Sequence, residues 1–213
     1  MYVPAHFDES RLDVLHALIR AHPLGALVTH GSQGLDANHL PFLLEAGPAG
    51  PGLLQAHVAR ANPLWRAVRD GDEVMVIFQA GDAYVSPNWY PSKHEQHRQV
   101  PTWNYMVAHA HGRIRIRDDA RFVRGLVGRL TKTHEAAQPI PWKMADSPRD
   151  YIDTLVEAIV GIEVELTRIV GKSKLGQNKE VRDIEGAARG LEAAGEDAVG
   201  QAMLACAREK TAG

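Results

Sequence analysis

TWNYMVAHAHGRIRIR, residues 102–117, is the stretch of sequence that predicts the fold. Its second half, 112–117, alternates strictly between small or apolar residues and arginine, which is the period of a strand with one buried face. Shorter apolar runs lie on both sides of it, and turn residues join most of them. The strand–helix–strand rhythm of a doubly wound sheet is absent. The sequence therefore predicts an α+β or mainly β protein built on an antiparallel sheet or barrel with flanking helices.

Six further strands and five helical segments complete this prediction. The strands are 24–29, 35–45, 53–58, 73–79, 83–86 and 160–170, with turns or loops at 31–34, 47–52 and 81–82. The helices are one that ends at His22-Pro23, a short one opened by Asn62-Pro63, one capped by Asp118-Asp119, one from Ser147-Pro148 to Val156, and a tail at about 179–210. Residues 87–101 are predicted to form an ordered loop, and residues 1–213 one domain.

Composition restricts the class of protein. The 213 residues carry a formal net charge of -2, whereas tight nucleic-acid binders are usually basic. No apolar run reaches the roughly 18 residues of a membrane helix, and the first residues lack the pattern of a secretory signal. The single cysteine, Cys206, excludes an intrachain disulfide and suits a reducing compartment. We expect a cytoplasmic protein that is not membrane-bound.

The 11 histidines do not form a recognisable metal motif. His94 and His97 are three positions apart, whereas HExxH needs four. His109 and His111 share a strand face, but no third ligand is obvious. We therefore predict no metal site.

A first candidate site contains Asn38, His39 and Pro41. Asn38 and His39 are neighbours on a strand, so one of them can face a cleft and donate to a planar heterocycle. Pro41 indicates an edge strand or the rim of a barrel. A surface strand with chance polar residues explains the same pattern, and the residues alone favour that plainer explanation.

A second candidate site is the segment from Arg60 to Pro63. A helix start presents free N–H groups to an anion, and Arg60 can fork onto a phosphate. A plain helix cap beside a solvated arginine fits these residues equally well.

Residues 84–105 hold five large aromatic residues, although the whole chain has only 4 Trp, 5 Tyr and 4 Phe. Such a segment can stack on a flat ring and bind its edge, or it can form a subunit interface. Further on, Lys174 and Gln177 lie in GKSKLGQN (171–178), where lysine can neutralise a phosphate. A solvated turn is the alternative explanation there.

Taken together, six motifs resemble those of the PaiB family of FMN-binding proteins. They are ANHLPF (37–42), HVARANP (57–63), YVSPNWYPSKHE (84–95), VPTWNY (100–105), LTKTHE (130–135) and GKSKLGQN (171–178), and the opening MYVPAHFDE is also similar. The resemblance covers essentially the whole chain. It implies a split β-barrel, a homodimer, and FMN at the subunit interface.

The resemblance also implies particular cofactor contacts. Asn38, His39 and Pro41 would lie near the flavin ring, and Arg60, Ala61, Asn62 and Lys174 near the phosphate. Trp103, Asn104 and Gln177 would approach from the partner subunit or close the pocket. Gly176 stands where the family pattern has serine, which removes one hydroxyl from the site.

Family members are described as negative transcriptional regulators, so a regulatory or redox-sensing role is expected. Three alternatives stay open. The first is a flavin-dependent reductase or oxidase, since the cofactor itself carries such chemistry. The second is haem binding or degradation, as in related split-barrel proteins. The third is direct DNA binding through the basic stripe Arg113, Arg115 and Arg117, against which the slightly acidic net charge argues.

Overall fold

A computed structural model describes residues 1–47 and 50–212 of the chain, which divides into two compact units. Unit 1 comprises Met1–Leu15, Gln79–Ala108 and Val170–Gly213, and unit 2 comprises His16–Phe78 and His109–Ile169. Pro48 and Ala49 of the predicted 47–52 loop, and Gly213 at the end of the predicted domain, lie outside the described residues.

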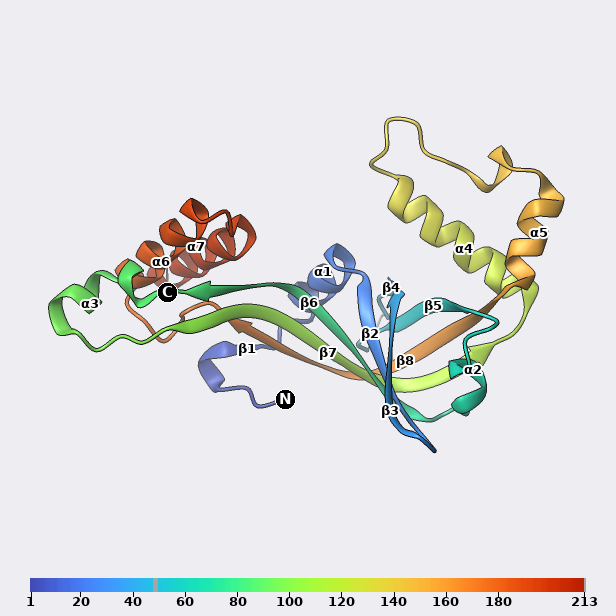
Figure 1. The fold of residues 1–213 in the computed structure, drawn as a ribbon, viewed down its shortest axis with the longest axis horizontal. Helices are drawn as coiled ribbons and strands as arrows, with labels where there is room; N and C mark the ends of the chain where they lie inside the picture. The colour runs from blue at the N-terminus through green and yellow to red at the C-terminus, as the bar shows by residue number, and fades with distance from the viewer. Residues whose placement is uncertain (48–49, 213) are drawn as a thin grey trace. The chain divides into compact units, whose positions relative to one another are not determined.

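A largely antiparallel sheet runs through the described part of the chain (Figure 1). Its strands follow the order β3-β2-β6-β7-β8-β5-β4, and β1 pairs with β8. The short strands are β1 (Asp8–Glu9), β2 (Leu24–Gly31), β3 (Gly34–Pro41), β4 (Leu43–Glu45) and β5 (Leu53–Ala59). The predicted hairpin is confirmed by the antiparallel register that joins β2 to β3. Its second strand is shorter than predicted, because β4 pairs with β5 instead.

Three long strands contribute residues to both units: β6 (Glu73–Val85), β7 (Thr102–Arg117) and β8 (Ile159–Lys174). β7 has the predicted bounds. The predicted turn at 81–82 is wrong, because Gly81 takes a φ of 118° within a continuous β6. β8 extends beyond its predicted end because β1 pairs with Gly171 and Lys172, a distant partner that local sequence does not reveal.

Unit 1 places short helices where the sequence predicted a loop. η2 (Pro87–Trp89) and α3 (Pro91–Gln96) each begin at a proline, whose fixed φ suits a first helical turn. The predicted helical tail is confirmed as two helices, α6 (Val181–Ala193) and α7 (Asp197–Ala212), which lie side by side (Figure 1). Gly195 separates them with a φ of 85°. A further 3-10 turn, η1 (Ala5–Phe7), precedes β1.

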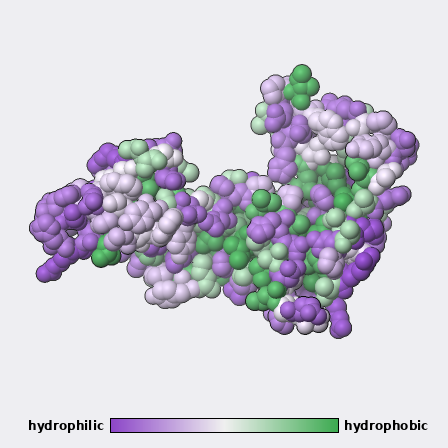
Figure 2. Space-filling model, viewed as in Figure 1, coloured by the Kyte–Doolittle hydropathy of each residue, from purple (hydrophilic) through white to green (hydrophobic). Residues whose placement is uncertain are grey.

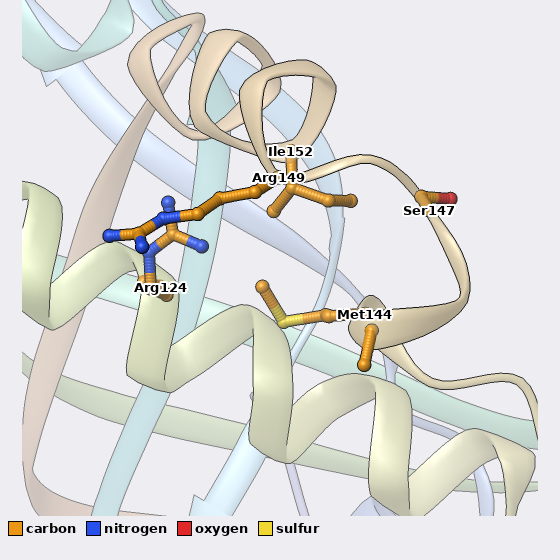
Figure 3. A pocket seen from close by; sticks show the side chains of 6 residues that line it. Arg124, Met144, Ser147, Arg149 and Ile152 are labelled. Carbon is orange, nitrogen blue, oxygen red and sulfur yellow. The ribbon is translucent and has the colours of Figure 1, made fainter.

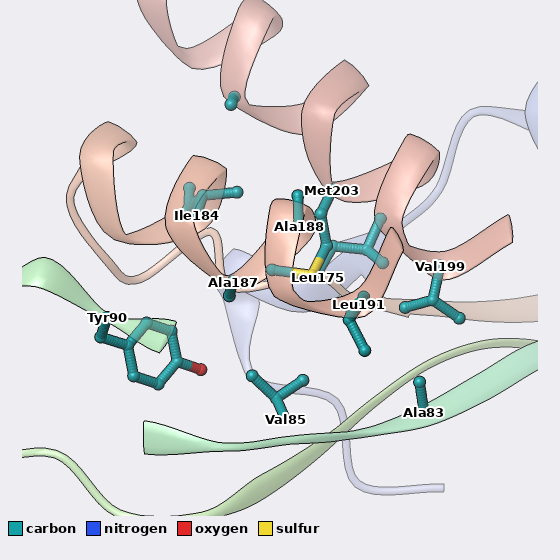
Figure 4. Packing of buried hydrophobic residues seen from close by; sticks show 11 residues of the cluster. Ala83, Val85, Tyr90, Leu175, Ile184, Ala187, Ala188, Leu191, Val199 and Met203 are labelled. Atoms are coloured by element: carbon teal, nitrogen blue, oxygen red, sulfur yellow. The ribbon is translucent and has the colours of Figure 1, made fainter. Parts of the chain in front are cut away.

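The core of unit 1 joins these helices to the aromatic segment (Figure 4). Val85 and Tyr90 meet Ile184, Leu191 and Met203 from α6 and α7. The Tyr90 side chain is only 1% exposed, and this burial raises the pKa of its hydroxyl to about 12.

Two glycines give α6 a flat face against η2. A Cβ at Gly186 would collide with the Trp89 carbonyl oxygen and with Pro91 Cδ at 2.8 Å. A Cβ at Gly190, one turn further on, would collide with the Trp89 ring. Glycine is therefore required at both positions to let the helix approach the aromatic segment closely.

Unit 2 carries a helical pair, α4 (Ala120–Glu135) and α5 (Arg149–Glu157), which pack side by side (Figure 1). The predicted cap of α4 is confirmed, since Asp119 Oδ1 accepts the Phe122 N–H. Val123, Ile152 and Val156 form a small core between the two helices. η3 (Met144–Asp146) lies in their connection. α1 (Leu12–Ala21) ends, and α2 (Leu64–Ala67) begins, near the predicted positions.

Polar side chains attach α4 to the sheet. Arg129 Nη2 donates to Gln55 Oε1 at 2.7 Å, and Gln55 Nε2 donates to Glu163 Oε1 at 2.8 Å. Arg117 Nη1 donates to the other Glu163 oxygen at 2.9 Å. Figure 2 shows hydrophobic residues gathered over the strands of unit 2, beside the more hydrophilic helices.

Substituting Gly190→Ala is expected to lower the free energy of unfolding by about 1–3 kcal/mol, because the new methyl group overlaps the Trp89 ring. Gly125→Ala in α4 is the matched control, since its Cβ would meet only Arg129 Nη1 at an ordinary 3.5 Å. Removing that helical glycine should stabilise the protein by up to about 1 kcal/mol. Urea denaturation measures both, and equal effects would contradict the packing described here.

Candidate functional site

The residues predicted from sequence to bind a cofactor fall into two groups, one in each unit. Unit 2 holds Asn38, His39, Pro41, Arg60, Ala61 and Asn62. Unit 1 holds Trp103, Asn104, Lys174 and Gln177.

In unit 2, Asn38 and Asn62 are brought together. Asn62 Nδ2 donates to Asn38 Oδ1 at 2.8 Å, and Asn38 Nδ2 donates to Asp36 Oδ2 at 2.9 Å. His39 is exposed, as expected for the neighbour of Asn38 on a strand. Pro41 ends β3, which lies at one end of the strand order, in keeping with its predicted edge position.

Arg60 is strongly engaged within unit 2. Its guanidinium forms a two-pronged pair with Asp118 at 2.6 and 3.0 Å, and it donates to the carbonyls of Glu157 and Ile159. These contacts occupy four of the five N–H groups that a guanidinium offers. The Asp118 carboxylate also raises the pKa of Arg60, so the side chain stays charged.

Most backbone N–H groups just after Arg60 also form hydrogen bonds within the protein. Asn62 N–H donates to the Ala59 carbonyl at 2.8 Å, and Asn62 Oδ1 accepts the Leu64 N–H at 2.9 Å. Ala61 is exposed between them. The Arg66 and Ala67 N–H groups both donate to the Pro63 carbonyl, so the start of α2 (Leu64–Ala67) has few free donors for an anion.

In unit 1, a pocket of about 220 Å³ contains two of the predicted residues, Asn104 and Lys174. Its other lining residues are Phe7, Tyr90, Val100, Thr102, Gly176, Asn178 and Lys179. Lys174 Nζ donates to Thr102 Oγ1 and to the Trp103 carbonyl oxygen, which uses two of its three donors. Asn104 is 1% exposed, and its amide lies 3.2 Å from Met203 Sδ.

Lys179 is the residue of this pocket that the sequence analysis missed. Its ammonium donates to Gln99 Oε1 at 2.6 Å and lies 4.4 Å from the centre of the Tyr90 ring. Burial lowers the pKa of Lys179, and it lowers that of Lys174, whose charge is also disfavoured by Lys172 and Lys179. The only sequence signal for Lys179 is its position directly after the GKSKLGQN motif.

Trp103 and Gln177 lie outside the lining of this pocket. Trp103 is 54% exposed and contacts Tyr84 edge to face, with ring centres 6.0 Å apart. Gln177 closes the turn after β8, where it accepts from Leu175 N–H at 2.9 Å and donates to the Ser173 carbonyl at 2.6 Å. Gly176 in this turn has a φ of 90°, a conformation that glycine adopts without strain.

The buried carboxylate of Asp183 is linked to the pocket by a chain of hydrogen bonds. Asp183 accepts from Ser92 N–H at 3.0 Å and from the Ser92 hydroxyl at 2.7 Å. Gln99 Nε2 donates to the same hydroxyl at 2.8 Å, and Gln99 Oε1 accepts from Lys179. The position of Lys179 is therefore fixed by side chains that do not line the pocket.

Two other features bear on the alternatives. Within the described residues, no three His, Cys, Asp or Glu side chains are grouped to hold a metal ion. Each arginine of the basic stripe lies near a carboxylate: Arg113 near Glu73 at 3.7 Å, Arg115 near Glu165 at 3.4 Å, and Arg117 near Glu163 at 2.9 Å. These acids offset the charge that DNA phosphates would need.

Solved structures share this fold at low sequence identity. A flavocytochrome from Azotobacter vinelandii matches with a TM-score of 0.59 and 12% identity, over 82% of this chain and 73% of that chain. An FAD- and heme-binding protein from Mycobacterium smegmatis matches with a TM-score of 0.57 and 17% identity, over 79% of this chain and 74% of that chain. The chain has the antiparallel split-barrel fold of flavin proteins, as the sequence predicted.

The sequence comparisons identify the family. The family model "Putative FMN-binding domain" matches residues 1–168. An uncharacterized protein of Emericella nidulans is 32% identical, over 99% of this chain and 97% of that protein. "Protease synthase and sporulation protein PAI 2" of Bacillus subtilis is 27% identical, over 86% of this chain and 85% of that protein. The chain belongs to this FMN-binding-domain family, the PaiB family.

None of the helices in residues 1–47 and 50–212 is both long enough and apolar enough to cross a membrane.

Replacing Asp183 with alanine is expected to lower the free energy of unfolding by about 2–4 kcal/mol, because the buried donors of Ser92 lose their acceptor. Asp183→Asn keeps one acceptor oxygen and should lose clearly less. Chemical denaturation compares both with Asp197→Ala, which alters an exposed acid of α7. Equal losses for Asp183→Ala and Asp197→Ala would contradict a structural role for Asp183.

Proposed function

We propose that this protein binds FMN as a homodimer, with the phosphate in the unit 1 pocket, and that the bound flavin serves a regulatory or redox-sensing role. The observation that carries the proposal is that two lysines, Lys174 and Lys179, line one small pocket of a chain that belongs to an FMN-binding family.

The chemistry of the pocket suits a phosphate. Two ammonium groups and the Thr102 hydroxyl line it, and the pocket's lining residues include no acidic side chain. Lys174 retains one donor beyond those given to Thr102 and Trp103. The pKa of Lys174 is lowered by burial and by the nearby charges of Lys172 and Lys179, and a bound anion would offset both effects.

The pocket is too small for a whole flavin nucleotide. Its volume of about 220 Å³ lies below the roughly 300–1,000 Å³ of sites that enclose ligands of that size. We assign it to the phosphate end and propose that the flavin ring packs on the exposed Tyr84–Trp103 pair. A second copy of the chain would then cover the ring, because half-exposed aromatic residues are typical of subunit interfaces.

Other predicted contacts keep their roles as proposals. The Asn38–Asn62 pair, with His39 and Pro41 beside it, offers amide groups suited to the polar edge of a flavin ring that packs on Trp103 of the other subunit. Arg60 is a less suitable phosphate ligand than Lys174, because a phosphate would have to displace Asp118 from it. We propose that Gln177 acts by holding the turn that carries Gly176.

A bound flavin supplies electron-transfer chemistry, which the protein tunes by binding and orienting it. The role of this chain's residues is then to hold the phosphate and cover the ring. Anaerobic addition of NADH or NADPH tests for a reductase: a regulator that only senses redox state is expected to leave NAD(P)H unconsumed at steady state.

FMN is expected to bind the wild-type protein, and Lys174→Gln is expected to weaken FMN about ten- to a hundredfold, the loss of one charge-assisted hydrogen bond. Riboflavin lacks the phosphate, so its affinity should not change. Flavin fluorescence titration measures the affinities of the wild-type and Lys174→Gln proteins for FMN and for riboflavin. Lys93→Gln, a lysine of unit 1 that does not line the pocket, is the control.

The same titration has a defined pH dependence. The pKa values of Lys174 and Lys179 are lowered, so both lose charge as pH rises through values below the ordinary 10.4 or so of lysine. FMN affinity should therefore fall at alkaline pH relative to riboflavin affinity. The proposal fails if purified protein has no flavin absorbance and FMN leaves its Tm unchanged.

Trp103→Glu is expected to convert the homodimer to monomer, because it places a charge in the proposed interface. Light scattering after size-exclusion chromatography measures the mass. Trp142→Glu in unit 2 is a matched control, since Trp142 is also about half exposed, at 41%. If Trp103→Glu stays dimeric, or the wild-type chain is a monomer with FMN bound, the assigned interface is wrong.

A further inference from the structure

The connection between α4 and α5 in unit 2 borders two adjoining cavities, both open to solvent, that the flavin proposal does not use. The first, of about 610 Å³, is lined by Arg124, Met144, Ala145, Ser147, Arg149 and Ile152 (Figure 3). The second, of about 500 Å³, lies along the end of α4, and Met144 lines both. Each volume is in the range of sites that enclose small molecules.

The first cavity has an excess of positive charge. Figure 3 shows the side chains of Arg124 and Arg149 converging on the same side of the cavity. Both reach a single carboxylate: Arg124 forms an ion pair with Asp153, and Arg149 Nε lies 3.8 Å from Asp153 Oδ2. One acid facing two guanidinium groups leaves one positive charge. The Arg149 side chain is 94% exposed, so it is free to turn toward an anion.

The second cavity is apolar, with cations at its rim. Gly128, Ala136, Pro141, Trp142 and Met144 form its apolar walls. Glu135 also lines it, but its carboxylate is engaged, because Oε2 accepts the Trp142 N–H at 2.9 Å. Lys132 and Lys143 line it too, and among the described residues neither ammonium has an ion-pair partner within 4.0 Å.

This cavity gives a role to the LTKTHE motif at 130–135, for which the flavin site has no use. Thr131, Lys132 and Glu135 of the motif all line the cavity. Ile140, in the loop that follows α4, is 90% exposed.

We propose that the two cavities form one binding site for a small amphipathic carboxylate. Its apolar chain or ring lies beside Trp142 and Met144, and its carboxylate is bound by Arg124 and Arg149. The planar guanidinium matches a carboxylate in two-pronged geometry, and the surplus positive charge supplies the electrostatic attraction. The ligand is a free small molecule, distinct from the flavin.

The test is isothermal titration calorimetry of the full chain with decanoate and with the neutral alcohol 1-decanol. Decanoate is expected to bind one per chain, about tenfold more tightly than decanol, because only the acid gains a charge-assisted contact. Arg149→Gln should remove most of that difference without weakening decanol. Trp142→Ala should weaken both ligands.

Arg121→Gln is the control, since Arg121 lies on α4, the helix that carries Arg124, and does not line either cavity. It should leave both affinities unchanged. Because Arg149 is almost fully exposed, its variant is expected to keep the wild-type Tm, which separates lost binding from lost folding.

Three results would overturn the inference. Decanoate does not bind, or it binds no better than decanol, or the Arg149 and Arg121 variants behave alike. Competition adds a fourth: if FMN displaces decanoate and Arg149→Gln weakens FMN, the cavity belongs to the flavin site. The Lys174 titrations report on FMN independently, so either proposal can fail without the other.

Discussion

A carboxylate withdrawn from water has to be met by hydrogen-bond donors, and in unit 1 this constraint falls on Asp183, which is only 2% exposed. Ser92 satisfies both of its oxygens and thereby fixes the start of α3 against α6. Tyr90 is buried as a result, and Gln99 is held where it can accept from Lys179. The pocket's electrostatics thus depend on an acid that no ligand would touch.

The sequence predicted those parts of the fold that local pattern controls. The alternation of residues 112–117 and the Asp119 cap gave the correct strand and helix, because a strand face and a capped helix start are both defined by near neighbours. The errors arose where the extent of a strand depends on a partner far away in the sequence or on an unusual backbone conformation. β8 extends because β1 pairs with it, and β6 continues because Gly81 takes a positive φ inside a strand.

The candidate site shows the same division. Asn104 and Lys174 were selected by motif and line one pocket, but Lys179 was missed because its role depends on Gln99, 80 residues away. For Arg60 the motif suggested a ligand contact, because its neighbours in the sequence suit a phosphate. In the structure its side chain is bound by Asp118 and Glu157, which lie far from it in the sequence and outside any linear motif. Contacts between distant segments decide which charged residue is available to a ligand.

The two units are interleaved along the chain, since unit 1 gathers three separate segments and unit 2 gathers two. Neither unit is a contiguous fragment, so no single truncation yields one without the other. Three of the four passages between them, at 78–79, 108–109 and 169–170, fall inside β6, β7 and β8, and the fourth, at 15–16, falls inside α1. A recombination event that exchanged only the lysine-bearing unit would therefore have to cut three strands and one helix, and it would break hydrogen bonds at each cut.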